Sequence, residues 1–281
     1  MKDHSNTISS TVSCMNHNRK RAILSMALAM SMHYFGYEFV RNSILSLFTS
    51  KQIGFDDSQL SNPEYVSAKR HHHLSASSYM SLAMAFSSPF SMFLLIFVYG
   101  KIFNRYGPKL ALTQNTLTCA IVFLFSSTLL YLFSEINSIS KNSPHSSYLS
   151  NIFLQNSLCH SLTISRTIIF CLFTFQNSYV GLLQSQHWAF IGSVLTPDEG
   201  KLLFPPIAGM ASIASTIAAA LVSPMVQLIG LHGLLMLGGC SLLLSASFGN
   251  HAYQIAEKVC ACFCFVFFNF VNADLHCTYM K

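Results

Sequence analysis

The segment GKIFNRYGPK, residues 100–109, is a short basic turn between two long apolar runs. Residues 79–99 form a run of 21 without a charge before it, and residues 110–133 form a run of 24 after it. Each run is long enough to cross a hydrocarbon core about 30 Å thick at about 1.5 Å per residue. The turn carries Lys101, Arg105 and Lys109 but no acidic residue, which is typical of a short cytoplasmic loop. The stretch therefore predicts two membrane helices joined by a cytoplasmic turn.

The composition favours a lipid bilayer as the solvent of this chain. Hydrophobic residues make up 52% and charged residues only 9%, against about 25% charged residues in a soluble domain. The 16 Lys and Arg residues lie at the ends of apolar runs and not along one helix face, so no nucleic-acid partner is expected. The partners expected from composition are membrane lipids.

The sequence offers no set of residues that predicts enzyme chemistry. No Ser-His-Asp set, His-Glu-x-x-His motif, phosphate-binding loop or pair of intramembrane carboxylates is found. Cys260, Cys262 and Cys264 alternate with other residues in a spacing that matches no zinc motif. The run at residues 71–73, His-His-His, is better explained as part of a solvated loop than as a metal site. We expect no cofactor and no metal.

The whole chain is predicted to be an all-α membrane protein with six transmembrane helices in residues 22–250. Residues 1–21 are Ser-, Asn- and His-rich and predict a disordered cytoplasmic tail. Residues 251–281 have an atypical composition, and we interpret them as an interfacial segment or as an end unrelated to the six helices. The predicted spans are residues 22–40, 79–99, 110–133, 168–195, 202–222 and 228–248.

Two features predict how these helices begin and pack. Thr196 followed by Pro197 and Glu199 is typical of a helix stop and restart. Small residues recur in the last two spans and predict close helix packing there. They are Ala208, Ser212, Thr216 and Ala220 in the fifth span, and Gly230, Gly233, Gly238 and Gly239 in the sixth.

The orientation follows from the basic residues on the two sides. With the N-terminus inside, the inner segments carry nine Lys and Arg residues and the outer loops carry five. This difference favours an integral, multi-pass membrane protein with its N-terminus on the cytoplasmic side.

Polar residues inside the predicted spans are the candidates for substrate binding. Glu38 and Arg41 are three residues apart in the first span and share a helix face. They are interpreted either as groups facing a cavity or as side chains that reach the membrane surface. Gln176, Asn177 and Gln184 in the fourth span favour a wet face, with interhelical hydrogen bonding as the alternative.

The opening segment resembles the loop between the second and third helices of the major facilitator superfamily, which reads Gly-x-x-x-Asp-Arg-x-Gly-Arg-Arg/Lys. Gly100, Arg105, Gly107 and Lys109 occupy matching positions, and Asn104 replaces the acid. The resemblance implies a six-helix half of a transporter in which this gating segment is held by charge pairs that stabilise one access state.

Residues 184–221 resemble the ATP/ADP translocase family within this superfamily, around Trp188, Glu199, Lys201 and the pair Phe204-Pro205. The resemblance implies a nucleotide or another organic anion as substrate. Gln176 and Ile44 stand where that family carries an acid and a lysine, which argues against ATP/ADP exchange itself.

Two hypotheses for function follow. The first is a membrane solute transporter of major facilitator type, in which this chain supplies one half of an alternating-access bundle and binds a small, anionic substrate. The second is a non-transporting membrane protein, either a degenerate half-transporter or a structural partner of other membrane subunits. A homodimer would supply the missing half in the first case, because two parallel repeats form the full architecture.

Overall fold

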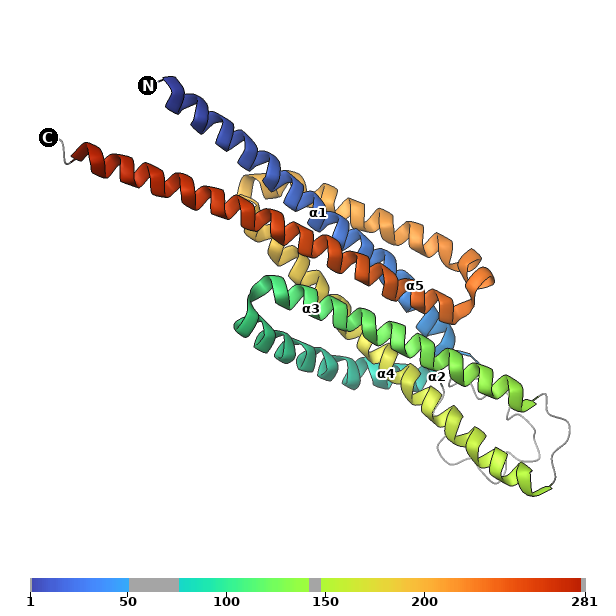
Figure 1. Cartoon of the computed structure of the whole chain (residues 1–281). Helices are drawn as coiled ribbons and strands as arrows, with labels where there is room; N and C mark the ends of the chain where they lie inside the picture. The colour runs from blue at the N-terminus through green and yellow to red at the C-terminus, as the bar shows by residue number, and fades with distance from the viewer. Residues whose placement is uncertain (1, 51–75, 142–147, 279–281) are drawn as a thin grey trace.

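The computed structural model describes the backbone of residues 2–50, 76–141 and 148–278, and the side chains of residues 17–50, 78, 80–133, 135 and 163–258. These backbone ranges are helical apart from two residues after the first helix and two before the last. The prediction of an all-helical chain is confirmed for them (Figure 1). The elements are α1 (Lys2–Phe48), α2 (Ala76–Leu82), the π-helical turn η2 (Ala83–Ser87), α3 (Ser88–Lys141), α4 (Tyr148–Val194) and α5 (Pro197–Thr278).

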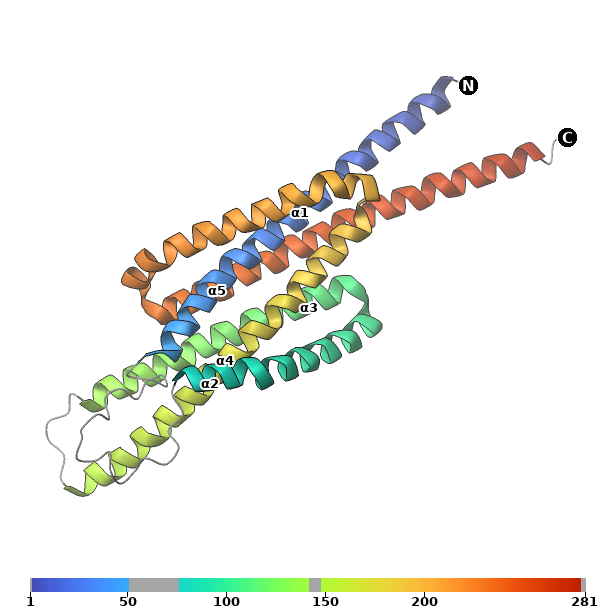
Figure 2. The ribbon, with the colours of Figure 1, turned by 180° about the vertical axis from the view of Figure 1, so that it is seen from behind.

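Helices α3 and α5 each reverse direction at a glycine. Gly107 has φ 82° and ψ 173°, and Gly230 has φ 70° and ψ −179°; glycine adopts these positive φ values without a Cβ clash. Each element is therefore two helices that fold back at the glycine (Figures 1 and 2). We call residues 88–106 and 108–141 the first and second arms of α3, and residues 197–229 and 231–278 the first and second arms of α5.

The second arm of α5 packs antiparallel against α1. The hydroxyl of Ser245 donates to the carbonyl of Ala29 at 2.7 Å, and the hydroxyl of Ser43 donates to the carbonyl of Leu231 at 2.6 Å. Residue numbers rise from 29 to 43 on α1 while they fall from 245 to 231 on α5. The same pairing of residues between the two antiparallel helices therefore continues from one hydrogen bond to the other. Bonds between a hydroxyl and a facing backbone carbonyl are a common way to join helices in membranes.

The two backbones approach most closely at a pair of glycines. A Cβ on Gly36 would lie 2.8 Å from the Cβ of Ser241, and a Cβ on Gly238 would lie 2.4 Å from Cγ2 of Val40. The predicted close-packing role of Gly238 is confirmed. A spacing of seven residues keeps one face of each helix toward its partner. We call the seven small residues at this spacing the small-residue seam: Ala22, Ala29, Gly36 and Ser43 on α1, and Gly238, Ser245 and Ala252 on α5.

The remaining helices join this pair through a shared core. The hydroxyl of Ser178 on α4 donates to the carbonyl of Ser88 at 3.0 Å, and the hydroxyl of Ser127 on α3 donates to the carbonyl of His232 at 2.7 Å. The fully buried side chains include Met26, Phe48, Phe123, Ile169 and Leu183. Helices α1, α3, α4 and α5 thus contribute to one apolar core.

The outside of the bundle exposes large apolar side chains. Phe86, Phe90, Phe93 and Phe97, in η2 and the first arm of α3, are between 53% and 71% exposed. Two helical stretches are long and apolar enough to cross a membrane, Met80–Phe133 and Pro197–Lys258, and each contains one of the two reversals. The small residues Ser212, Thr216 and Ala220 in the first arm of α5 are exposed, whereas their sequence pattern predicted a helix packed against them.

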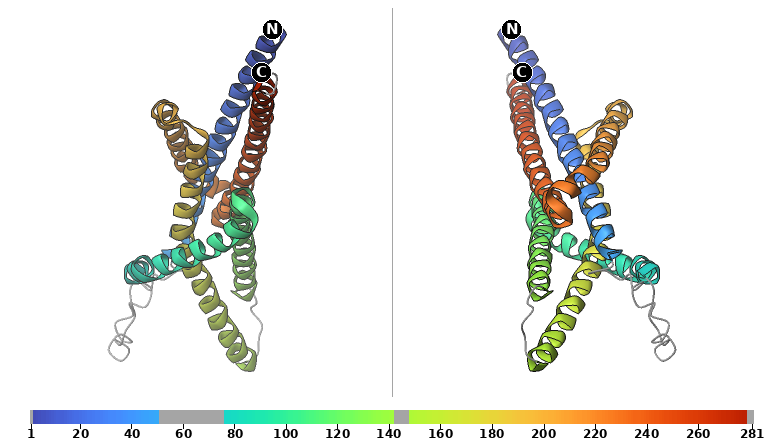
Figure 3. Two further views of the ribbon diagram at one scale, coloured as in Figure 1. Left: turned by 90° about the vertical axis from the view of Figure 1, so that its left-hand side faces the viewer. Right: turned by 90° about the vertical axis from the view of Figure 1, so that its right-hand side faces the viewer.

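One end of the molecule collects the basic segments and their ion pairs. The Gly107 turn, the α4–α5 junction and the outer ends of α1 and α5 lie toward the same end (Figures 1 and 2). The outer ends of α1 and α5 also run together in the views of Figure 3. Arg19 forms an ion pair with Glu199, and Nζ of Lys109 lies 2.7 Å from a carboxylate oxygen of Glu257. The first pair links α1 to the first arm of α5, and the second pair links the second arm of α3 to the second arm of α5.

Several element boundaries differ from the predictions. Helix α1 begins at Lys2, where a disordered tail through residue 21 was expected, and α5 continues through residues 251–278, where a separate tail was expected. The first arm of α5 also passes Pro224 and ends at Gly230. Extending an existing helix is easier than starting one, so polar sequence beside an apolar helix continues it. The predicted loop histidines, residues 71–73, lie outside the described residues.

Candidate functional site

Helix α1 places Glu38 toward the bundle interior and leaves Arg41, three residues later, largely exposed. The Glu38 side chain is 14% exposed, and one of its oxygens accepts a hydrogen bond of 2.9 Å from the hydroxyl of Ser215 on α5. Its other oxygen lies 4.0 Å from Nη1 of Arg41, whose side chain is 57% exposed. Glu38 is therefore held between two helices, while the cationic group of Arg41 stays open to a ligand.

Of the three predicted amides, Gln176 is the one with a side-chain bond to α1, the helix that carries this pair, in the described structure. Gln176 is 2% exposed and forms a side-chain hydrogen bond with Tyr37 of α1. Asn177 donates to the carbonyl of Phe173 in its own helix at 2.8 Å. Gln184 is half-buried and lies about 12 Å farther along α4 than Gln176, at about 1.5 Å per residue. The structure thus brings together a set that we call the polar cluster: Tyr37, Glu38, Arg41, Gln176 and Ser215.

A second polar group lies beside the polar cluster, and the sequence did not single it out as a site. His33 of α1 is fully buried, with its ring centroid 5.7 Å from those of Tyr179 and His187 on α4. Nδ1 of His187 lies 2.6 Å from the carbonyl of Leu183, so Nδ1 carries the proton and leaves Nε2 as an acceptor in the neutral ring. We call His33, Tyr179 and His187 the histidine cluster.

The histidine cluster contains several buried polar atoms without partners. Within the described part of the chain, both ring nitrogens of His33 and the hydroxyl of Tyr179 make no hydrogen bond, and neither do the two amide atoms of Gln186, the residue before His187. Leaving such a group unpaired costs about 1–3 kcal/mol. Proteins rarely keep this many unpaired polar atoms together unless a ligand, an ion or an ordered water serves them. The histidine cluster is thus suited to hold a small polar species.

The predicted gating segment is mostly helical. Gly100 lies inside the first arm of α3, as do the exposed residues Asn104 and Arg105, and the turn itself is confined to Gly107. Lys109 is the one member of the segment with an ion pair to another helix among the described residues, and its partner Glu257 belongs to the stretch predicted as an atypical tail. A charge pair therefore links this segment to α5, through an acid that the family pattern did not indicate.

In residues whose side chains the structure describes, no three His, Cys, Asp or Glu side chains gather at one point. The histidine cluster supplies two imidazoles and no carboxylate or thiolate. A structural zinc site uses four such ligands.

The junction of α4 and α5 carries the predicted helix restart. The backbone N–H and the hydroxyl of Thr196 donate to the Glu199 carboxylate at 3.0 and 2.7 Å. Glu199 lies between the predicted spans, and these bonds, chiefly the one from the backbone N–H of Thr196, hold the pKa of its carboxyl below the ordinary value. The prediction that Thr196 ends one helix and starts the next is confirmed.

Comparisons with known proteins add no relative to these observations. No protein-family model matches the chain, and neither the curated proteins nor the solved structures yield a similar protein. The resemblance to the major facilitator superfamily therefore stays a prediction from the sequence motifs.

Proposed function

We propose that this chain is a membrane solute transporter of major facilitator type that carries nucleotides or other organic anions. In this proposal its helices supply one half of an alternating-access bundle. The observation that carries the proposal is the polar cluster, in which the nearly buried Glu38 of α1 is bonded to Ser215 of α5 and lies beside Arg41, close to the buried amide of Gln176 on α4. Ionisable groups at membrane depth are costly and usually mark a substrate or ion pathway.

The distribution of apolar sequence supports a membrane location with six crossings. The two stretches long and apolar enough to span a membrane each contain a reversal, so each would cross twice. Helices α1 and α4 would provide the other two crossings. These two helices carry the polar cluster and the histidine cluster, and their polar residues make them less apolar than α3 and α5. The side chains of both clusters lie where α1, α4 and α5 pack together.

The charge of the site supports an anionic substrate. Glu38 is bonded to Ser215 and nearly buried, whereas Arg41 is exposed and keeps most of its five guanidinium donors for a ligand. A guanidinium matches carboxylate and phosphate oxygens through paired hydrogen bonds. The cluster thus presents a fixed acid that positions an accessible cation.

Uptake by reconstituted protein tests the proposal. The purified chain would be placed in liposomes loaded with nucleotides or dicarboxylates, and uptake of the labelled anion would be measured. We expect the Arg41→Gln and Glu38→Gln variants to lose uptake at least tenfold. Lys201→Gln is the matched control because this lysine is exposed at the end of the bundle and pairs only with Asp198 in the described structure. Equal uptake by all variants would show that the polar cluster binds no substrate.

The non-transporting alternative is supported by the hydrogen bonds of the amide side chains in α4. Gln176 is occupied by Tyr37, and Asn177 by its own helix, as expected of groups that only hold helices together. A chain of this kind would act as a partner of other membrane subunits or as a dimer. Native mass measurement decides: a strict monomer with no uptake of any anion would refute the transporter and favour this alternative.

A further inference from the structure

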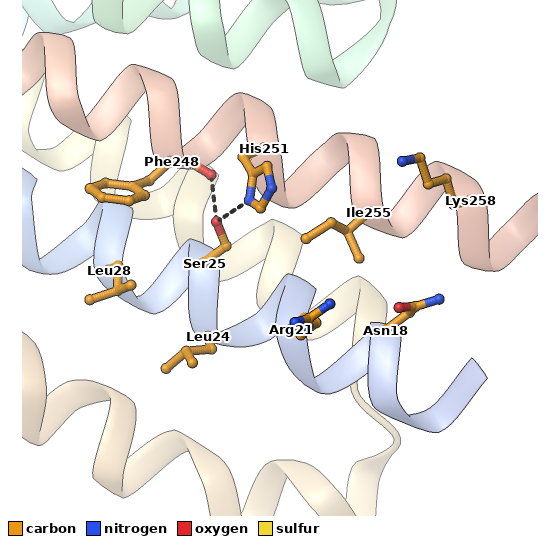
Figure 4. Close-up of a pocket in the computed structure, with 9 residues that line it drawn as sticks. All are labelled: Asn18, Arg21, Leu24, Ser25, Leu28, Phe248, His251, Ile255 and Lys258. Carbon is orange, nitrogen blue, oxygen red and sulfur yellow. Dashed lines mark hydrogen bonds between the residues drawn. The ribbon is translucent and has the colours of Figure 1, made fainter. Parts of the chain in front are cut away.

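A cavity of about 490 Å³ lies between α1 and the second arm of α5, near the basic end of the molecule (Figure 4). Its volume is within the range of about 300–1,000 Å³ that is usual for small-molecule sites. It is distinct from the polar cluster and the histidine cluster, because none of its lining residues belongs to either. The cavity is therefore a separate candidate binding site.

The lining changes from polar to apolar along the helix axes. Arg21 and Lys258 lie toward one end of the cavity, from opposite helices, and Leu24, Leu28 and Phe248 lie toward the other (Figure 4). No acidic residue lines it. A site with two cations at one end and aliphatic carbon at the other fits an amphipathic anion better than a free inorganic ion.

The middle of the cavity provides a polar contact that bridges the helices. The hydroxyl of Ser25 lies 3.0 Å from the carbonyl of Phe248, to which it donates, and 3.3 Å from Nδ1 of His251. This arrangement fixes the imidazole of His251 by one nitrogen and leaves the other ring nitrogen directed away from Ser25. Because Ser25 gives its proton to the carbonyl of Phe248, Nδ1 of His251 is the donor to Ser25, and the other ring nitrogen of the neutral imidazole is an acceptor.

The two cations are not neutralised within the described structure. The neighbouring charges Arg19 and Glu257 pair with Glu199 and Lys109, respectively. Arg21 and Lys258 are exposed, and neither has a carboxylate partner among the residues whose side chains are described. Their charge is therefore available to a ligand.

The cavity also lies where a membrane surface is expected. The first predicted span begins after Arg21 and the sixth ends at Phe248, so the cations are on the aqueous side and the leucines on the lipid side. Leu24 is 54% exposed, which opens the apolar end toward the surrounding lipid. Basic pockets between membrane helices on the cytoplasmic side suit acidic lipid headgroups.

We propose that this cavity binds the phosphate headgroup of an anionic glycerophospholipid. The phosphate sits between Arg21 and Lys258, and the first part of an acyl chain lies along Leu24 and Leu28. The proposal rests on the proposed membrane location but not on transport. Because the assay measures binding and not uptake, a chain that binds lipid but moves no solute would refute only the transporter.

Native mass spectrometry of the full chain in detergent tests the site, with phosphatidylglycerol and phosphatidylcholine as probes. We expect tighter binding of phosphatidylglycerol, and a loss of about thirtyfold in the Arg21→Gln, Lys258→Gln double variant, given the usual contribution of each basic residue near an acidic lipid. The matched control is the Lys20→Gln, Lys101→Gln double variant, which removes the same charge from exposed positions outside the cavity. Circular dichroism and size exclusion confirm that both variants are folded.

Three outcomes would overturn the proposal. Equal losses in the two double variants would mean that only the overall charge matters. Equal binding of both lipids, which share a phosphodiester, would mean that the cavity does not recognise the net negative charge of the headgroup. Complete displacement of phosphatidylglycerol by soluble glycerol 3-phosphate would identify a free phosphate ester as the ligand in place of a lipid.

Discussion

The small-residue seam makes a quantitative prediction for Gly238→Ala. The added Cβ would lie 2.4 Å from Cγ2 of Val40 and 3.0 Å from the carbonyl oxygen of Gly36, whereas carbon atoms in contact are separated by about 3.5–4.0 Å. The helices must therefore separate by roughly 1 Å, and such overpacking costs about 1–3 kcal/mol. Alanine recovers about 1 kcal/mol through its helix propensity, so we expect a net loss of about 0–2 kcal/mol.

Gly209→Ala is the matched control, because this helical glycine has no neighbour within 4 Å of an added Cβ. It gains the same helix propensity without the clash. The free energies of unfolding of the two variants should therefore differ by about 1–3 kcal/mol, or about 2–12 °C in the midpoint of thermal unfolding for a chain of this size. The measurement is thermal unfolding of the purified proteins in detergent, followed by circular dichroism at 222 nm. Equal midpoints for the two variants would refute the close approach of α1 and α5.

Three further predictions concern the ends and the interior of the bundle. Lys109→Met and Glu257→Gln should each lower the stability by at most about 1 kcal/mol, because this ion pair is partly exposed. Salt screens such a pair, so the difference in unfolding midpoint between each variant and the parent chain should become smaller as the salt concentration rises. The pKa of Glu199 is lowered in the folded chain by the N–H of Thr196, so the unfolded state binds the proton more tightly. The stabilisation from this carboxylate is therefore present above the unfolded pKa of about 4.3 and is lost as the pH falls below it. Unfolding of Glu199→Gln, measured between about pH 3 and pH 7, should lack this pH-dependent loss of stability. His33→Leu should not lower the midpoint of thermal unfolding, because both ring nitrogens lack partners among the described residues, and it should abolish uptake if the histidine cluster serves the transported solute.

Contrary results are easily recognised. An unchanged salt dependence in Lys109→Met would mean that the ion pair with Glu257 contributes nothing to stability. A pH profile of Glu199→Gln identical to that of the parent chain would assign the acid sensitivity to other groups. Strong destabilisation by His33→Leu would mean that the imidazole has a structural partner.

The parts of the fold that depend on neighbouring residues were predictable. Gly107 followed by Pro108 marks a turn because glycine tolerates a positive φ and proline favours a first helical turn. Thr196 and Glu199 likewise form a local cap that a spacing of three residues reveals. The ends of α1 and α5 were not predictable in this way, because a polar sequence can continue a helix that its apolar neighbour has already started.

The candidate site was predictable only in part, because it is assembled from distant segments. The shared face of Glu38 and Arg41 follows from their spacing, but Ser215 is 177 residues from Glu38 and no local signal pairs them. His33 and His187 lie in separate predicted spans, and only the packing of α1 on α4 shows that their rings meet. The spacing of seven in the small-residue seam was present in the sequence and would have indicated that α1 packs on the second arm of α5.

The antiparallel register of α1 and α5 has a consequence for the order in which the protein assembles. The hydrogen bond from Ser43 to Leu231 joins positions 188 residues apart, so α1 leaves the ribosome long before its principal partner exists. At about 5–20 residues per second, α1 waits about 10–40 seconds for the second arm of α5. During that interval the face that carries Gly36 and Ser43 is uncovered, so α1 needs a temporary partner on that face until α5 is made.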